Sequence, residues 1–205
     1  MENRANPLES FSKDQVRDFF DALAQDWDQG MIRNQRIIDA ILDAAGIGPG
    51  MRVLDVGCGT GALLGDYLAR GAAAVTGVDL SPEMIRVAKS KFSDPRVTLL
   101  AADIESIGFS EPFHCCVVYN AFPHFPQPGR LIACLAKTLA IGGRLTIAHG
   151  MSRAKLDRHH SGSAQRVSVG LMHEDALAEL FAPFFQVDVK ISDGEKYIVS
   201  GIKEG

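Results

Sequence analysis

The stretch 52–62, RVLDVGCGTGA, constrains the fold of this chain more than any other. It begins as a short apolar run rich in β-branched residues, which is typical of a buried strand. Asp55 interrupts this run, and the residues after the loop read as a helix. The loop itself holds three alternate glycines, Gly57, Gly59 and Gly61. A strand, a glycine loop and a helix in this order predict the first half of a nucleotide-binding βαβ unit, because glycine lets a ligand approach the backbone closely.

Aspartates occur near the ends of three predicted strands. Asp55 belongs to the first, Asp79 closes the run 74–78, and Asp103 follows the run 97–102. An acid about 20 residues beyond the glycines is placed to accept hydrogen bonds from ribose hydroxyls. A dinucleotide would bring its pyrophosphate close to Asp55, where like charges repel, so this acid favours a ligand with a cationic group such as an ammonium. The three acids together predict a site for an adenosine that carries an amino acid.

On these motifs the chain resembles the class I S-adenosylmethionine-dependent methyltransferases. The matching segments are 53–61, 77–84 and 102–104, and the resemblance extends over roughly residues 30 to 150. Within this family the chain looks most like the small methyltransferases grouped with quinone and other small-molecule methylases. The resemblance implies S-adenosyl-L-methionine as the cofactor and S-adenosyl-L-homocysteine as the product.

The resemblance also implies which residues hold the cofactor. Met84 matches a residue that packs against the adenine. Asn120, at the end of the fourth predicted strand, is suited to hold the amino-acid portion of the ligand. The complete set of implied cofactor-binding residues is Asp55, Gly57, Cys58, Gly59, Gly61, Asp79, Leu80, Met84, Asp103, Ile104 and Asn120.

Histidines supply the candidate catalytic groups. Methyl transfer from a sulfonium mainly requires alignment and exclusion of water, so a base is needed only when the nucleophile arrives protonated. His124 and His149 follow the ends of neighbouring predicted strands, so we expect both to project over the crevice as candidate bases. His159 and His160 lie on the long polar segment that follows and are candidate substrate-binding residues. The four imidazoles could instead form a metal site or be unrelated polar residues, and no metal is assigned because no carboxylate or cysteine has a ligand-like spacing beside the pair.

Two aromatic residues are further candidates for binding the substrate. Phe122 belongs to an aromatic-rich rim after the fourth predicted strand. Trp27, the sole tryptophan, lies between two predicted N-terminal helices, which in the family lie over the cofactor. It is either a hydrophobic anchor at the corner between these helices or a lid residue that touches substrate or cofactor.

The predicted fold class is α/β, with a doubly wound Rossmann-like sheet that is mostly parallel, a C-terminal antiparallel hairpin and helices on both faces. We expect a single domain with a helical cap over residues 1–46, a cofactor-binding core over 51–150 and a substrate-side loop, helix and terminal hairpin over 151–205. A helix over 129–140 is expected to turn at Gly142 and Gly143 into the fifth strand.

Composition narrows the class of partner. The 205 residues are 46% hydrophobic and 22% charged, which is typical of a globular domain. A net charge of −4 offers no basic field for nucleic acid, and no apolar run is long enough to span a membrane. Four cysteines without disulfide or zinc spacing favour a reducing, cytoplasmic location. We therefore expect a small-molecule acceptor with an O, N, C or S nucleophile. The alternatives are a regulatory protein that binds S-adenosylmethionine without turnover, and a dinucleotide-dependent oxidoreductase.

Overall fold

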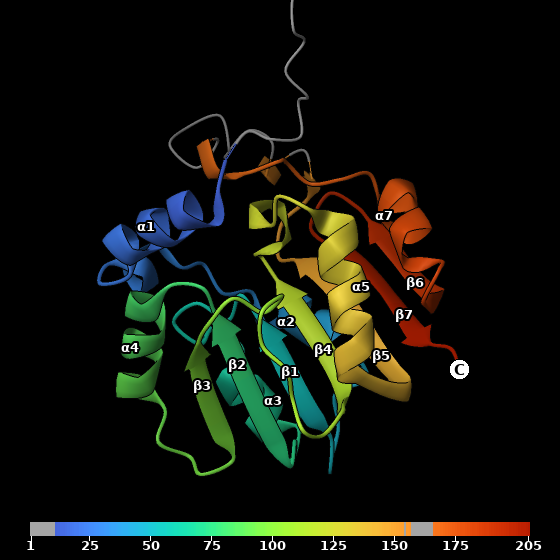
Figure 1. Cartoon of the computed structure of the whole chain (residues 1–205), viewed down its shortest axis with the longest axis horizontal. Coiled ribbons are helices and arrows are strands. Elements are labelled where there is room, and N and C mark those ends of the chain that lie inside the picture. Colours follow the sequence, from blue (N-terminus) through green and yellow to red (C-terminus); the bar gives the residue numbers. More distant parts are fainter. Residues whose placement is uncertain (1–10, 154, 157–165) are drawn as a thin grey trace, which may run out of the picture.

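The computed structural model describes residues 11–153, 155–156 and 166–205, which fold around one seven-stranded sheet (Figure 1). The strands are arranged in the order β3-β2-β1-β4-β5-β7-β6. The first five are parallel, whereas β7 runs antiparallel to both β5 and β6. The predicted fold class is therefore confirmed. The strands are β1 (Arg52–Val56), β2 (Ala74–Asp79), β3 (Val97–Ala101), β4 (Phe113–Tyr119), β5 (Leu139–His149), β6 (Phe185–Ser192) and β7 (Tyr197–Lys203).

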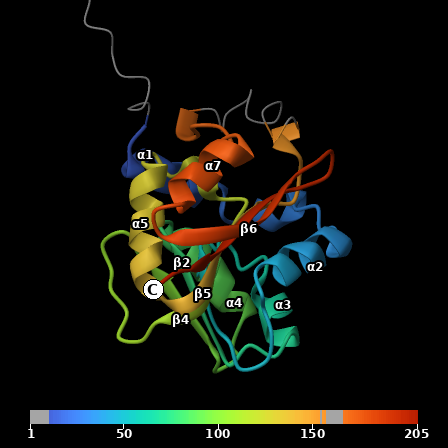
Figure 2. The same cartoon turned by 90° about the vertical axis from the view of Figure 1, so that its right-hand side faces the viewer.

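Helices cover both faces of the sheet. Figure 2 shows α5 on one side and α2 and α3 on the other. Each face has its own apolar cluster, one including Leu135 of α5 and Phe181 of α7, the other including Leu42 of α2 and Leu64 of α3. Burial on both faces explains why the central strands are continuous apolar runs. The helical segments are α1 (Lys13–Leu23), η1 (Trp27–Gly30), α2 (Gln35–Ala44), α3 (Leu64–Ala69), α4 (Pro82–Lys91), η2 (Phe122–His124), α5 (Pro128–Thr138) and α7 (Glu174–Phe181).

Local sequence signals determine where the helices begin. Ser12 and Gln15 form a capping box at the start of α1, where each side chain accepts a hydrogen bond from the backbone N–H of the other. Ser81 caps α4 by accepting from the backbone N–H of Met84, and Pro82 occupies the first helical position. Both starts were predicted from the sequence and are confirmed.

The boundary between α5 and β5 differs from the prediction. The helix ends at Thr138 and the strand begins at Leu139, whereas the sequence predicted a helix to residue 140 and a turn at the glycine pair. The pairing of β5 with β4 shifts register between Leu139 and Arg144, and Gly142 lies within this irregularity with a φ of 77°. The glycine pair therefore forms a bulge inside a longer strand rather than the turn before it.

The longest described helices, α1 and α5, contain 11 residues each. Across the three described ranges, no helix combines the length and the apolar character needed to cross a membrane. All four cysteines are free, and Cys115 and Cys116 are buried in β4 as predicted.

Candidate functional site

A cavity of about 530 Å³ opens at the carboxyl ends of the parallel strands. The loops after β1, β2, β3 and β4 line it, and α1 and η1 contribute its remaining wall. Strand β1 lies between β2 and β4, so the chain order reverses beside β1, which is where open α/β sheets bind ligands. We use the name cap for α1, η1 and residues 31–34, the part of the wall that precedes the sheet (Figure 1).

The glycine loop brings the backbone to the cavity surface. Gly57 has a φ of 67°, and a Cβ added to it would lie 2.5 Å from the Cβ of Ala121. Gly59 has a φ of 54° and no atom within 4 Å of such a Cβ, so its surface faces open space. Both positions require glycine, the first for close packing and the second for its left-handed backbone. The open space at Gly59 is a cradle that a ligand can occupy.

Asp79 is held by the loops on either side of it. Its Oδ2 accepts from the backbone N–H of Gly59 at 2.8 Å, and its Oδ1 accepts from the backbone N–H of Ser81 at 2.9 Å. Burial raises the pKa of Asp79, and the two backbone donors oppose that rise. Each carboxylate oxygen can accept a second hydrogen bond, so Asp79 is a fixed acceptor at the cavity wall.

Asp55 lies deeper than Asp79 and is 2% exposed. Burial and then the charge of Asp79 raise the pKa of Asp55 to about 7, against the opposing effect of the nearby Tyr67 phenol. A cationic group in the cavity would favour the charged form of this carboxyl.

At the end of β3, the cap contributes a cation to the site. Lys13 Nζ donates to both carboxylate oxygens of Asp103, at 2.7 and 2.9 Å, and to Glu105 Oε2 at 2.6 Å. Burial opposes both changes, but these hydrogen bonds raise the pKa of Lys13 and lower that of Asp103. A lysine in the first turn of a helix opposes the helix dipole, so its position is explained by these tertiary partners.

Two further sets of contacts attach the cap to the loops that follow β1 and β2. Asp28 of η1 accepts from Thr60 Oγ1 of the glycine loop at 2.5 Å and from Lys91 of α4 at 2.6 Å. Asp21 of α1 accepts from the Ser81 hydroxyl at the start of α4. Together with Lys13, these contacts tie the cap to the loops that follow β1, β2 and β3.

Between the acids, the cavity wall is apolar. Met84 and Ile104 are 1% and 3% exposed, and both line the cavity together with Leu80 and Cys58. Burial raises the pKa of the Cys58 thiol well above its ordinary value, so this cysteine acts as an apolar wall residue rather than a nucleophile. The wall suits a flat, uncharged ring with polar groups at its edge.

Asn120 marks the end of β4 and has a left-handed backbone, with a φ of 54°. Its Oδ1 accepts from the backbone N–H of Gly150 at 2.9 Å. The amide oxygen is therefore engaged, Nδ2 is the donor group of the side chain, and Asn120 lines the cavity. An amide presented this way suits an acceptor such as a carboxylate.

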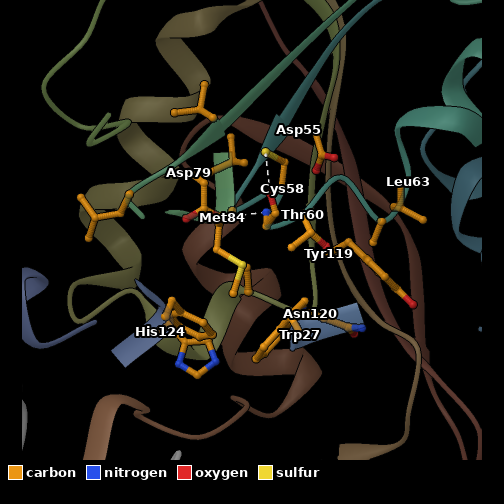
Figure 3. A pocket seen from close by; sticks show the side chains of 18 of the residues that line it. Trp27, Asp55, Cys58, Thr60, Leu63, Asp79, Met84, Tyr119, Asn120 and His124 are labelled. Carbon is orange, nitrogen blue, oxygen red and sulfur yellow. Dashed lines mark hydrogen bonds between the residues drawn. The ribbon is translucent and has the colours of Figure 1, made fainter. Parts of the chain in front are cut away.

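His124 and Trp27 lie at the other end of the cavity. Figure 3 shows both of them on the opposite side of Met84 from Asp55. His124 Nδ1 lies 2.7 Å from the carbonyl oxygen of Val167, and its ring meets Phe20 of α1 edge-on at 4.9 Å. Because a carbonyl only accepts, Nδ1 carries the proton in neutral His124 and Nε2 is the basic nitrogen. Phe20 also contacts Trp27 edge-on at 5.4 Å, so these three rings form a continuous aromatic wall.

Comparison with known proteins identifies one domain of the chain. A family model described as a methyltransferase domain matches residues 53–143, which hold the glycine loop and the loops carrying Asp79, Asp103 and Asn120. Residues 53–143 therefore form a methyltransferase domain. A ubiquinone biosynthesis O-methyltransferase from Xanthomonas campestris pv. campestris (strain B100) is 38% identical over 104 residues, which span 49% of this chain and 43% of that protein. The chain therefore matches less than half the length of that curated relative.

Solved structures share the fold over most of this chain. A chain in the complex between the Haloferax volcanii Trm112 methyltransferase activator and a methyltransferase matches with a TM-score of 0.78 at 20% identity, covering 91% of this chain and 98% of that one. Magnesium protoporphyrin IX methyltransferase from Synechocystis PCC 6803, solved with bound SAH, matches with a TM-score of 0.70 at 20% identity, covering 94% and 99%. Identities this low establish the common architecture only.

Most of the predicted site residues line the cavity. They are Trp27, Asp55, Gly57, Cys58, Gly59, Asp79, Leu80, Met84, Asp103, Ile104, Asn120 and His124. Gly61 does not line it. A Cβ added there would lie 2.8 Å from both Leu64 and Phe92, so Gly61 serves the packing of the loop against its helices.

Two predicted residues lie elsewhere in the described structure. Phe122 is fully buried in the core, because η2 directs it away from His124, and Phe125 lines the cavity instead. His149 was expected to project over the crevice, but it is 1% exposed and is not among the cavity-lining residues. Strand β5 continues through His149, which pairs with Tyr197 of β7, and the two rings meet edge-on at 6.4 Å between their centroids.

His159 and His160 lie outside the described residues. Within the described residues, no group of three His, Cys, Asp or Glu side chains is arranged to hold a metal ion.

Sequence reasoning missed the cap residues that line the cavity, among them Lys13, Phe20, Leu23 and Arg33. Arg33 donates to the Ala62 carbonyl and to both oxygens of Asp66. The resemblance implied that the N-terminal helices lie over the cofactor, and the helical spacing of Val16, Phe20 and Leu23 predicts an apolar face, but neither identifies which side chains line the cavity.

Proposed function

We propose that this protein binds S-adenosyl-L-methionine in the cavity and transfers its methyl group to an oxygen of a small, partly apolar acceptor. The observation that carries the proposal is the arrangement of Asp55, Asp79 and Asp103 around one cavity beside the open surface of Gly59. The curated relatives are named as O-methyltransferases, which favours an oxygen nucleophile. The cofactor, when bound, would supply the activated methyl group on its sulfonium.

The polar groups of the cavity match the cofactor along its length. Asp79, anchored by two backbone donors, would accept from the ribose hydroxyls. The adenine would lie in the apolar slot of Leu80, Met84 and Ile104. Asp103 lies beside this slot and would accept from the exocyclic amino group through the lone pairs that Lys13 leaves available.

The amino-acid end of the cofactor needs partners of both charges. Asp55 would face the ammonium, which would lower its raised pKa. For the carboxylate, the cavity offers the Nδ2 donors of Asn120 and the guanidinium of Arg33. The three protons of Lys13 are already shared among three carboxylate oxygens, whereas the Arg33 contacts leave its Nε–H available.

We propose His124 as the base that accepts the proton of the acceptor hydroxyl. The Val167 carbonyl orients the ring and assigns the lone pair to Nε2. Phe20 and Trp27 beside it form an apolar surface that excludes water from the reacting atoms. His149 takes no part in this proposal, because it is buried and does not line the cavity.

Two measurements test the proposed function. Isothermal titration with S-adenosylhomocysteine should show saturable binding, and an acceptor screen read by S-adenosylhomocysteine release should find turnover with phenols or catechols. Absence of binding at millimolar ligand would refute the cofactor assignment. Binding without turnover on any acceptor would instead favour the regulatory alternative.

His124→Gln tests the base separately from the cofactor site. It should lower turnover by about 10²- to 10⁴-fold, which is the usual contribution of a positioned base, and leave the affinity for S-adenosylhomocysteine unchanged. His173→Gln is the matched control, because His173 caps α7 and does not line the cavity. Equal turnover in the parent and His124→Gln would exclude His124 as the base.

A further inference from the structure

A second carboxylate lies behind Asp103 at the end of β3. The side chain of Glu105 is 4% exposed and does not line the cavity. Among the residues that the structure describes, it pairs with two cations: Lys13 Nζ lies 2.6 Å from Oε2, and Arg130 Nε lies 3.2 Å from the same oxygen. A buried charge without a partner is costly, and an exposed pair contributes little. Because the Arg130 side chain is 63% exposed, Lys13 is the main partner that compensates Glu105.

The carboxylate of Asp103 is fully engaged in the structure. Its Oδ1 accepts from Lys13 Nζ at 2.9 Å and from the Glu105 backbone N–H at 3.0 Å. Its Oδ2 accepts from Lys13 Nζ at 2.7 Å and from the Ser106 hydroxyl at 3.1 Å. A carboxylate has about four acceptor positions, so a further donor has to replace one of these. The Ser106 contact is exposed and is the longest of the four, so it is the contact that an incoming donor would replace.

The charge of Lys13 keeps Asp103 in the form that accepts hydrogen bonds. Burial opposes the change, but the Lys13 hydrogen bond lowers the pKa of Asp103. Without this ammonium, the carboxylates of Asp103 and Glu105 would face one another, and like charges at close range favour protonation of one of them. A protonated Asp103 would present a hydroxyl donor toward the exocyclic amino group of an adenine, which is itself a donor.

Helix α1 brings this ammonium to the site from outside the sheet. Lys13 is its first residue, and Asp21 of the same helix accepts from the Ser81 hydroxyl. The helix therefore bridges the loops after β3 and β2, between which we place the adenine. Its attachment to the β3 loop rests on the two carboxylates that Lys13 contacts.

We propose that Lys13 is the positioning residue of the adenine site, and that by holding Asp103 as an acceptor it makes the site select a 6-amino purine over a 6-oxo purine. This inference rests on the proposed function and specifies how its cofactor is recognised. Because Lys13 reaches Asp103 from α1, recognition of the purine ring depends on docking of the cap.

S-inosylhomocysteine, the 6-oxo analogue of S-adenosylhomocysteine, isolates this contact because the two ligands differ in the purine ring alone. Its oxygen would face the Asp103 carboxylate, where two acceptors repel. Isothermal titration of the full chain with each ligand gives the ratio of the two dissociation constants. A hydrogen bond to a charged group determines the difference, so the parent should bind S-adenosylhomocysteine about 10- to 100-fold more tightly.

Three variants test the part that Lys13 plays. Lys13→Met removes the ammonium and should lower the ratio to about threefold or less, mainly by weakening S-adenosylhomocysteine. Lys13→Arg keeps the charge and should retain most of the ratio. Combining Lys13→Met with Glu105→Gln also removes the repelling carboxylate and should restore the ratio toward that of the parent. Loss of helix packing alone would not be restored in this way.

Lys196→Met is the matched control. Lys196 also donates to a carboxylate, that of Asp193 at 2.7 Å, but it does not line the cavity. Its substitution should leave the affinity for both ligands unchanged. If Lys13→Met does not fold, Lys13→Gln takes its place, because it keeps a neutral donor and should show the same loss.

Three outcomes would overturn the proposal. A ratio near one in the parent means that Asp103 does not read the amino group, and an unchanged ratio without the ammonium means that Lys13 does not hold Asp103. A loss that Glu105→Gln leaves uncorrected assigns Lys13 to the packing of α1. Failure of the proposed function is distinguishable from these results, because the parent would then bind no S-adenosylhomocysteine.

Discussion

Replacing Asp79 with asparagine tests the centre of the cofactor site. In the structure, Oδ2 faces the N–H of Gly59 at 2.8 Å and Oδ1 faces the N–H of Ser81 at 2.9 Å. Asparagine has one oxygen and one NH₂ group, so one of the two backbone donors would face another donor. An unsatisfied buried donor costs about 1–3 kcal/mol, and we expect the free energy of unfolding to fall by about that amount.

The same substitution should weaken cofactor binding. A hydrogen bond to a charged group contributes about 1.5–3 kcal/mol. Loss of one ribose contact should therefore raise the Kd for S-adenosylhomocysteine by about 10- to 100-fold, since 1.4 kcal/mol corresponds to a factor of ten. Isothermal titration gives the affinity, and urea unfolding of the free protein gives the stability.

Asp94→Asn is the matched control for Asp79→Asn. Asp94 also accepts from a backbone N–H two residues ahead, that of Arg96 at 2.9 Å, but it does not line the cavity. Its substitution should leave the Kd unchanged. If Asp79→Asn folds and binds S-adenosylhomocysteine as tightly as the parent, the ribose assignment is wrong. If its stability equals that of the parent, the two backbone contacts do not anchor the loop.

Two further predictions concern stability. The pKa of Asp55 is raised from 3.8 to about 7, so the folded protein favours the neutral acid, and stability should fall as the pH rises from about 4 to 7, by up to about 4 kcal/mol. Asp55→Asn should remove that dependence and be more stable than the parent at pH 8; identical pH profiles in urea unfolding would contradict this. Gly57→Ala should lower the free energy of unfolding by more than the strain of a left-handed alanine, about 1–2 kcal/mol, because its Cβ would meet Ala121. Gly50→Ala, at a φ of 79° with no neighbour within 4 Å, should lower it only by that strain. Thermal unfolding compares these two variants, and equal losses would exclude the clash.

The direction of a side chain at the end of a strand decides whether a predicted site residue lines the cavity. Asp79 is the last residue of β2 and lines the cavity, as its place at the end of a predicted strand suggested. His149 was expected just beyond the fifth strand, but β7 pairs with β5 as far as His149 and extends the strand by one residue. Since successive strand residues point to opposite faces, an error of one residue in the end of a strand is enough to change which side chain reaches the cavity.

The same limit applies to η2. Phe122 and His124 are two residues apart in one turn, and only His124 lines the cavity. Helical geometry directs residues at this spacing to different sides, and burial of the phenylalanine ring in the apolar core is favourable. The sequence identified the segment but not which of its side chains faces the ligand.

The sequence by itself determined the methyltransferase domain over 53–143, the order of strands and helices, and the three acids at the ends of β1, β2 and β3. These features are local, since a glycine loop, a cap residue or an apolar run acts on its immediate neighbours. Tertiary structure alone decided the wall contributed by the cap, where Lys13 meets Asp103 and Asp28 meets Thr60 across 90 and 32 residues of chain. Such contacts depend on how α1 and η1 dock onto the sheet, and no local pattern encodes that geometry.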